Sequence, residues 1–175
     1  SGRAQTGTGK TAAFLITMFS KFLREPIQGD RPIGTPRALV LAPTRELAIQ
    51  VSSAIEAYGR IQGIRVTTVY GGAPIGPQLG ELQRGVHVVV ATPGRALDHI
   101  RRRSLDLSHV QTVVLDEADE MLDMGFTDDI ESILESTPED RQTVLFSATM
   151  PKEIRHLADD VLHKPAVVEL AHSRP

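Results

Sequence analysis

Six short apolar runs, rich in β-branched residues, recur along the chain and constrain its fold more than any other feature. They lie at 38–42, 66–70, 86–91, 112–115, 143–146 and 166–170. Several have no alternating polar residue, which is typical of strands buried on both faces of a parallel sheet. Stretches with helical spacing separate them, at 10–24, 46–61, 117–122, 128–134 and 153–162. This alternation predicts a doubly wound α/β domain.

Composition excludes several classes of protein. Hydrophobic residues make up 41% and charged residues 23% of the 175 residues, which indicates a globular chain. The absence of cysteine excludes a disulfide scaffold, a thiolate metal site and a thiol nucleophile. The six histidines lack zinc-ligand spacing, and no apolar run reaches the ~20 residues that span a bilayer. We therefore expect no zinc, no membrane and a cytoplasmic location. The net charge of −3 argues against a wholly basic domain but allows local binding of nucleic acid.

Small or polar residues directly follow five of the apolar runs. In open parallel α/β sheets, ligands bind beyond the carboxyl ends of the strands. The chemistry of this chain is therefore expected at one edge of the sheet. The residues are Pro43, Thr44, Arg45 and Glu46; Gly71 and Gly72; Thr92, Pro93, Gly94 and Arg95; Asp116, Glu117, Ala118 and Asp119; and Ser147, Ala148 and Thr149.

A glycine-rich segment before the first expected helix has the pattern of a phosphate-binding loop. It comprises Ala4, Gln5, Thr6, Gly7, Thr8, Gly9, Lys10 and Thr11. The glycines let backbone amides approach a polyphosphate, the lysine reaches its β- and γ-phosphates, and the threonine hydroxyl that follows can ligate Mg²⁺. Ala4 stands where the general pattern has glycine. The alternative is a glycine-rich turn with a chance lysine.

An acidic pair, Asp116 and Glu117, follows the fourth apolar run. In a nucleotide hydrolase, Asp116 would hold Mg²⁺ and Glu117 would orient or deprotonate the attacking water. The alternative is an acidic helix N-terminus that the helix dipole stabilises.

Together these motifs resemble the DEAD-box ATP-dependent RNA helicase family, in a bacterial style. The matching segments are AQTGTGKT at 4–11, PTRELA at 43–48, GG at 71–72, TPGR at 92–95, DEAD at 116–119 and SAT at 147–149. The resemblance covers essentially the whole chain. It implies one RecA-like P-loop NTPase domain over 1–175, the N-terminal domain of its family, with a mostly parallel sheet and helices on both faces.

The resemblance also implies a role for each motif. ATP and Mg²⁺ would be the cofactors, held by 4–11 and Asp116, with Lys10 and Glu117 serving hydrolysis. RNA would be the partner, bound through its backbone without sequence preference. Its contacts would be Pro43, Thr44, Arg45, Glu46, Gly71, Gly72, Thr92, Pro93, Gly94 and Arg95. Ser147 and Thr149 would form hydrogen bonds toward Asp119 and link the nucleotide state to the grip on RNA.

The family normally has parts that this sequence does not show. They are an adenine-reading segment, a strand leading into the phosphate loop, and a second RecA-like domain that completes the ATP site. We therefore expect an unfilled slot or exposed edge in the sheet. We also expect the chain alone to hydrolyse ATP weakly or not at all, because arginine fingers contribute ~10³–10⁵ in rate to such reactions.

Two other functions stay open from the residues alone. One is a nucleotide-independent module that contacts RNA or docks a protein. The other is a DNA-directed helicase or translocase built on the same core, because 2′-hydroxyl contacts that would distinguish RNA from DNA are not visible in a sequence.

Overall fold

A computed structural model of the chain describes Met18, residues 35–161 and residues 167–169. The phosphate loop expected at 4–11 lies outside these residues. So does the helix expected at 10–24, except for Met18, which is helical and only 2% exposed.

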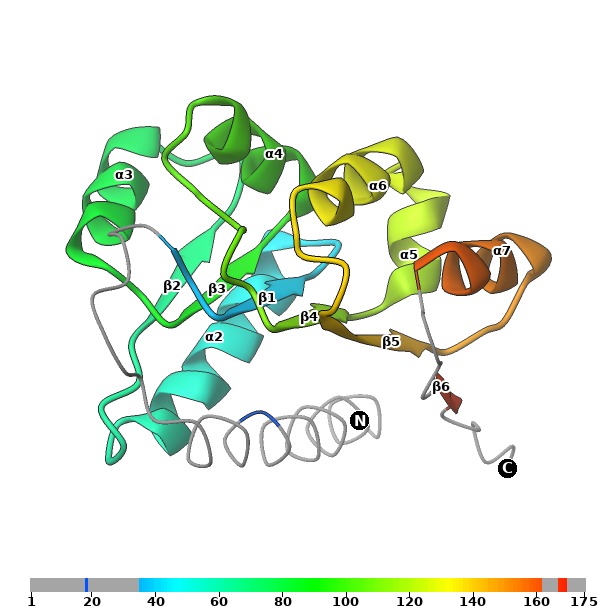
Figure 1. Cartoon of the computed structure of the whole chain (residues 1–175), viewed down its shortest axis with the longest axis horizontal. Helices are drawn as coiled ribbons and strands as arrows, with labels where there is room; N and C mark the ends of the chain where they lie inside the picture. The colour runs from blue at the N-terminus through cyan, green and yellow to red at the C-terminus, as the bar shows by residue number, and fades with distance from the viewer. Residues whose placement is uncertain (1–17, 19–34, 162–166, 170–175) are drawn as a thin grey trace.

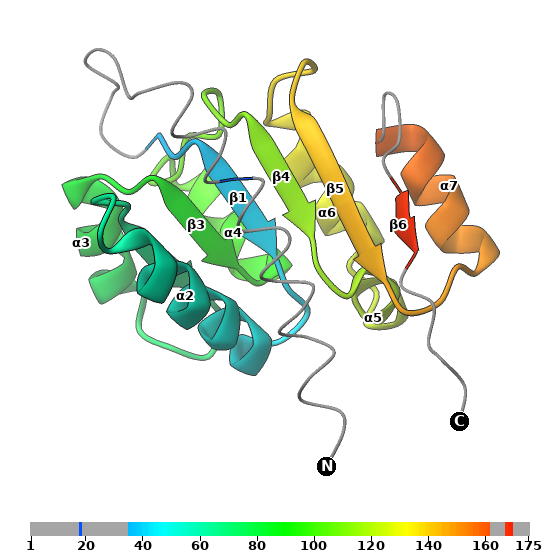
Figure 2. The same cartoon turned by 90° about the horizontal axis from the view of Figure 1, so that it is seen from below.

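The described strands form one sheet of six, and every neighbouring pair is parallel. They are β1 (Ala38–Leu41), β2 (Val66–Val69), β3 (Val88–Ala91), β4 (Thr112–Leu115), β5 (Gln142–Ser147) and β6 (Val167–Glu169), in the order β2-β3-β1-β4-β5-β6. Figure 2 shows β3, β1, β4, β5 and β6 side by side with their arrows pointing the same way. Each of the six apolar runs coincides with one strand, so the predicted parallel α/β fold is confirmed.

The described strands leave no unfilled slot in the sheet. β6 pairs directly with β5, with Leu145 opposite Val167. The sheet ends at β2 on one side and β6 on the other.

Helices cover both faces of the sheet. They are α2 (Arg45–Gly59), α3 (Ile75–Arg84), α4 (Pro93–Arg101), α5 (Ala118–Asp123), α6 (Thr127–Glu135) and α7 (Lys152–Val161). In Figure 1, α2 lies on one side of the sheet and α3, α4, α5 and α6 lie on the other. This three-layer arrangement explains why the strands need apolar side chains in both directions.

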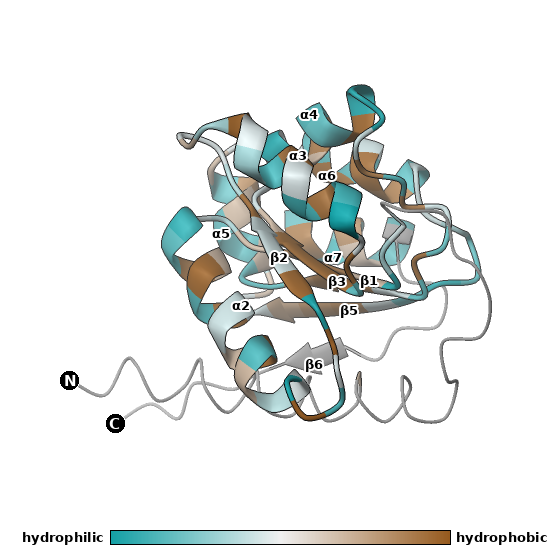
Figure 3. Ribbon diagram, turned by 90° about the vertical axis from the view of Figure 1, so that its left-hand side faces the viewer, coloured by the Kyte–Doolittle hydropathy of each residue, from teal (hydrophilic) through white to brown (hydrophobic). Residues whose placement is uncertain are grey.

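Two hydrophobic cores flank the sheet, and β1 contributes to both. Leu39 and Leu41 enter the core under α3 to α7, whereas Ala38 and Val40 enter the core that α2 closes with Val51 and Ile55. Figure 3 shows hydrophobic colour along β1, β3 and β5 between the helical layers. Each large side chain buried in this way stabilises the fold by about 1.5–3 kcal/mol.

Helices α3 and α4 both lie outside the stretches with helical spacing, and α3 also contains residues that disfavour a helix. Gly76, Pro77 and Gly80 all have low intrinsic helix propensity. Pro77 nevertheless sits in the first turn, where its missing N–H breaks no helical hydrogen bond. Burial of Leu82, which is 1% exposed, fixes the helix against the sheet. Tertiary packing therefore overrides local propensity at this point.

In the part of the chain that the structure describes, no helix combines the length and apolarity needed to cross a bilayer.

Candidate functional site

The carboxyl ends of β1, β2, β3 and β4 lie level with one another, and β5 runs two residues further. The register aligns Leu41 of β1 with Ala91 and Leu115 on its two sides, and continues outward to Val69 and Leu145. The residues two positions further along these strands are Pro43, Pro93, Glu117, Gly71 and Ser147. The structure thus brings the sequence-predicted residues of these five segments to one edge of the sheet.

The segment after β1 starts helix α2 and places an arginine against an aromatic ring. Thr44 adopts an extended conformation, and its Oγ1 accepts a hydrogen bond from the Leu47 amide at 3.2 Å. Arg45 is exposed, and its guanidinium carbon lies 5.2 Å from the centroid of the Tyr70 ring. This cation–π contact connects the start of α2 to the end of β2 and restrains the charge of Arg45. Glu46 is exposed in the same helical turn.

The segment after β3 starts helix α4 differently. Thr92 is the N-cap but makes no side-chain capping hydrogen bond, and Pro93 occupies the first turn. Gly94 is exposed, and a Cβ added there would meet no atom within 4 Å. The N-terminal end of α4, with its partial positive charge, is therefore neither capped by the Thr92 side chain nor covered at Gly94.

The segment after β2 is a glycine pair at the surface. Gly72 has φ +76°, a left-handed conformation that favours glycine. Gly71 has no such conformation, and a Cβ on either residue would meet nothing within 4 Å. Nothing within the described chain therefore requires glycine at position 71, whereas close approach of an external ligand to the backbone would.

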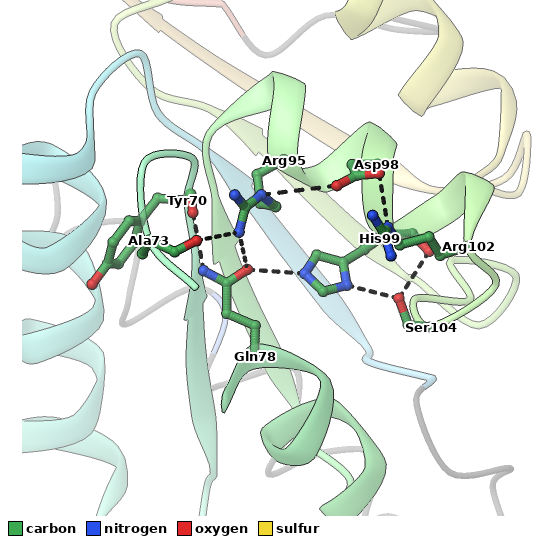
Figure 4. A network of polar contacts seen from close by, with 8 residues as sticks. All are labelled: Tyr70, Ala73, Gln78, Arg95, Asp98, His99, Arg102 and Ser104. Carbon is green, nitrogen blue, oxygen red and sulfur yellow. Dashed lines mark hydrogen bonds and ion pairs between the residues drawn. The ribbon is translucent and has the colours of Figure 1, made fainter. Parts of the chain in front are cut away.

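Arg95, in the first turn of α4, reaches the loop after β2 and is largely enclosed. Its side chain is 16% exposed. Its Nη1 donates hydrogen bonds to the carbonyl of Ala73 at 3.0 Å and to Oε1 of Gln78 at 3.1 Å. Its Nε lies 4.0 Å from a carboxylate oxygen of Asp98. Figure 4 shows Arg95 within this polar network rather than projecting alone. Arg95 was predicted as a contact to RNA, and in the structure it also braces the loop after β2.

Two further buried polar residues belong to this network and were missed by the motif analysis. Gln78 of α3 is 7% exposed and His99 of α4 is 0% exposed. Their side chains join through Oε1 and Nε2 at 2.9 Å, and His99 Nδ1 lies 2.7 Å from Oγ of Ser104. Burial lowers the pKa of His99, and the nearby charge of Arg95 lowers it further.

The acidic pair follows β4 at the same edge of the sheet. The amide of Asp116 donates to the carbonyl of Leu41 at 2.9 Å, which extends the β1–β4 ladder by one residue. Glu117 is the N-cap of α5 with φ 49° and ψ 52°. A left-handed conformation costs a non-glycine residue roughly 1–2 kcal/mol. Such strain is often found at functional sites.

A third acid, Asp119, bonds to the segment after β5. Its Oδ2 accepts hydrogen bonds from Thr149 Oγ1 at 2.9 Å and from the Thr149 amide at 3.2 Å. Ser147 was also expected to bond toward Asp119, but its hydroxyl donates instead to the Thr149 carbonyl at 2.6 Å. Ser147 therefore supports the residue that contacts Asp119.

The donor set at this edge fits Mg²⁺ bound jointly with phosphates. No group of three or more potential metal ligands occurs among the described residues. Mg²⁺ at a nucleotide site usually takes only one or two carboxylates plus phosphate oxygens and water. Asp116 is half-buried at the end of β4 and is a carboxylate of this kind.

Comparison with known proteins gives consistent results. Residues 1–157 match the family model described as "DEAD/DEAH box helicase". The chain is 52% identical over 169 residues to the ATP-dependent RNA helicase CshA of Listeria monocytogenes, covering 97% of this chain and 31% of that protein. It is 55% identical over 165 residues to the ATP-dependent RNA helicase DeaD of Mycobacterium tuberculosis, covering 94% and 28%.

A solved structure shares the fold. The crystal structure of a hypothetical ATP-dependent RNA helicase from Sulfolobus tokodaii matches with a TM-score of 0.81 and 42% identity. The match covers 94% of this chain and 46% of that one. The chain thus spans about a third of the curated relatives and about half of the solved one.

Proposed function

The chain belongs to the DEAD/DEAH box helicase family, and from this premise we propose that it is the N-terminal, ATP-binding RecA-like domain of an ATP-dependent RNA helicase. The observation that carries the proposal is that the carboxyl ends of five neighbouring strands lie at one edge of the sheet. Acidic residues follow β4, and groups suited to a phosphate backbone follow β1, β2 and β3. Mg²⁺, a cytoplasmic location and a second RecA-like domain are parts of the same proposal.

In the ATP half of the site, residues 4–11 would bind the phosphates, with Lys10 at the β- and γ-phosphates. Thr11 and Asp116 would hold Mg²⁺, which neutralises developing charge on the phosphates when bound. Glu117 would orient the attacking water and accept its proton. The left-handed backbone of Glu117 supports this role, because it sets the direction of the carboxylate at the end of β4.

In the RNA half, the three segments after β1, β2 and β3 would follow the phosphate backbone. The uncapped N-terminus of α4 offers backbone amides, the surface at Gly71 and Gly94 allows close approach, and Arg45 supplies positive charge. Phosphate contacts of this kind carry no sequence information, so binding would not depend on base sequence.

The Asp119–Thr149 bond would connect the ATP half of the site to the segment after β5, and through it would link the nucleotide state to the grip on RNA. It ties α5, which begins at Glu117, to the segment after β5. In a two-domain protein, ATP and RNA would bind across the cleft between domains, and closure would locally destabilise a short duplex. Hydrolysis would reopen the cleft and release RNA.

The test is ATP turnover with and without RNA, on this chain and on a longer protein that also carries the proposed second domain. Lys10→Ala and Glu117→Gln should each reduce RNA-stimulated turnover roughly 10²-fold or more. Glu120→Gln is the matched control, because Glu120 is an exposed acid on the same helix α5.

Two outcomes would replace the proposal. Equal turnover in Lys10→Ala and the unmodified protein, with RNA binding intact, would favour a nucleotide-independent binding module. Equal stimulation by deoxyribo- and ribo-oligonucleotides at the same stated salt concentration would favour a DNA-directed enzyme.

A further inference from the structure

The buried amide of Gln78 connects three elements around the loop after β2. Its Nε2 donates to the carbonyl of Tyr70 at 3.0 Å. Its Oε1 lies 3.1 Å from Nη1 of Arg95 and 2.9 Å from Nε2 of His99. Figure 4 shows the three contacts converging on this one side chain from β2 and α4. A buried amide held by three hydrogen-bond contacts is a rigid connection.

The chemistry of the partners permits only one orientation of this amide. A guanidinium can only donate and a backbone carbonyl can only accept, so Oε1 must face Arg95 and Nε2 must face Tyr70. Oε1 then requires a donor from His99, which places the imidazole proton on Nε2. His99 Nδ1 is then an acceptor, and the hydroxyl of Ser104 lies 2.7 Å from it and 3.1 Å from the His99 carbonyl.

The network holds the glycine pair from both sides. Tyr70 and Ala73 flank Gly71 and Gly72, and their carbonyls accept from Gln78 and Arg95 at 3.0 Å each. A Cβ at either glycine would meet nothing within 4 Å, so the two glycines themselves have no side-chain contacts that position the turn. The two carbonyl bonds restrain the turn on either side of the glycines, and the contact between Arg45 and the Tyr70 ring adds to the restraint on one side.

We propose that Gln78 and His99 are positioning residues that hold the Gly71–Gly72 turn, and the guanidinium of Arg95, ready for contact with a nucleic-acid backbone. The choice of ligand rests on the function proposed above, whereas the restraint on the turn does not. Without the network, two glycines would have to be ordered at the moment of binding, and the entropy cost would lower affinity.

The test compares Gln78→Met with Gln83→Met. Methionine has a similar length to glutamine but cannot form these hydrogen bonds. Gln83 is exposed on the same helix α3 and provides the same chemical change away from the network. The measurements are ¹⁵N order parameters of the Gly71 and Gly72 amides, affinity for a fluorescent ten-nucleotide oligouridylate, and affinity for ATP.

In Gln78→Met we expect the order parameters of the turn to fall to about 0.6 or below, while those of β4 stay near 0.85. We expect oligouridylate affinity to fall about tenfold with ATP affinity unchanged. Gln83→Met should match the unmodified chain in every measurement. In the unmodified chain, ¹⁵N shifts should show the His99 proton on Nε2.

Unchanged order parameters, or an equal loss of order in β4, would overturn the proposal. If a protein with both proposed domains does not bind oligouridylate, the proposed RNA function fails, and the order parameters still decide whether the network holds the turn. If Gln78→Met does not fold, Ser104→Ala replaces it, since it leaves Gln78 in place and removes the hydroxyl contacts with Nδ1 and the carbonyl of His99. Ser104→Ala should also lower the order parameters of the Gly71 and Gly72 amides. Unchanged order parameters in that variant would count against the proposal.

Discussion

Thr149 and Asp119 are 30 residues apart in the sequence, yet both the amide and the hydroxyl of Thr149 donate to one oxygen of Asp119. Asp119 lies in the first turn of α5, directly after the acidic pair. Thr149 lies between β5 and α7. A displacement of the acidic pair would therefore be transmitted to the segment after β5 through this bond.

Thr149→Val removes the hydroxyl donor and keeps the shape of the side chain and its backbone amide. If the bond couples the two halves of the site, RNA stimulation of ATP turnover should fall several-fold while ATP affinity stays constant. The ratio of turnover with and without RNA, measured in a protein with both proposed domains, checks this.

Thr127→Val at the start of α6 is the control for this substitution, because Thr127 is half-buried and far from the strand ends in sequence. A stimulation ratio in Thr149→Val equal to that of the control would remove the coupling role from Thr149.

The sheet and its functional edge were predictable because their signals are local. Uninterrupted β-branched runs mark buried parallel strands, and parallel strands place their carboxyl ends together. The strand ends agree with the predicted runs to within one or two residues, and β5 extends one residue beyond its run at each end, to Gln142 and Ser147. The residues that follow these strands therefore lie where the sequence predicts.

The network around Gln78 could not be found in the same way. Its members are brought together by helix packing, and α3 itself was obscured by two glycines and a proline. One signal was present: Gln78 lies at the i+3 position between Ile75 and Leu82, on the apolar face of the helix. A polar residue at a core position indicates a buried hydrogen-bonded group. Its partners on α4 are set by tertiary structure.

Arg103 offers a test of stability that is independent of function. It follows the end of α4 with φ 61°, is exposed, and donates its amide to the Ile100 carbonyl at 3.0 Å. Glycine is favoured at such a helix end. Arg103→Gly should raise the free energy of unfolding by up to about 1 kcal/mol, as measured by urea denaturation.

Arg103 also belongs to a run of three arginines at 101–103, and the same variant tests whether this residue contacts RNA. Unchanged oligouridylate affinity in Arg103→Gly would confirm that this arginine is a solvated helix end. A loss of affinity greater than about threefold would instead make it part of the RNA contact.

The stability of the fold should depend on pH through His99. Burial lowers the pKa of His99 from its ordinary value of 6.5, with Arg95 adding to the effect and Asp98 opposing it. The unfolded chain therefore binds a proton more readily than the folded chain. The stabilising contribution is complete above about pH 6.5 and is lost as the pH falls from there through the lowered folded pKa.

The expected slope in that window is positive and at most about 1.4 kcal/mol per pH unit for one proton. Urea denaturation between pH 7.5 and pH 5 measures it. His99→Gln should flatten the slope in this window relative to the unmodified chain. His109→Gln is the control, since His109 is exposed and should leave the slope unchanged. If the slope in His99→Gln equals the slope in His109→Gln, His99 is not the source of the pH dependence of stability.

Gly94→Ala should change stability and RNA binding in opposite directions. Gly94 lies in the first turn of α4, exposed, with no atom within 4 Å of an added Cβ. Alanine is the better helix former, so the free energy of unfolding should rise by roughly 0.5 kcal/mol. The same methyl group would stand between the helix N-terminus and an approaching phosphate, so oligouridylate affinity should fall about tenfold.

Gly80→Ala is the matched control, because Gly80 lies within α3 and an added Cβ there also meets nothing within 4 Å. It should stabilise the chain without weakening RNA binding. If both variants bind RNA as tightly as the unmodified chain, the start of α4 is not a phosphate contact.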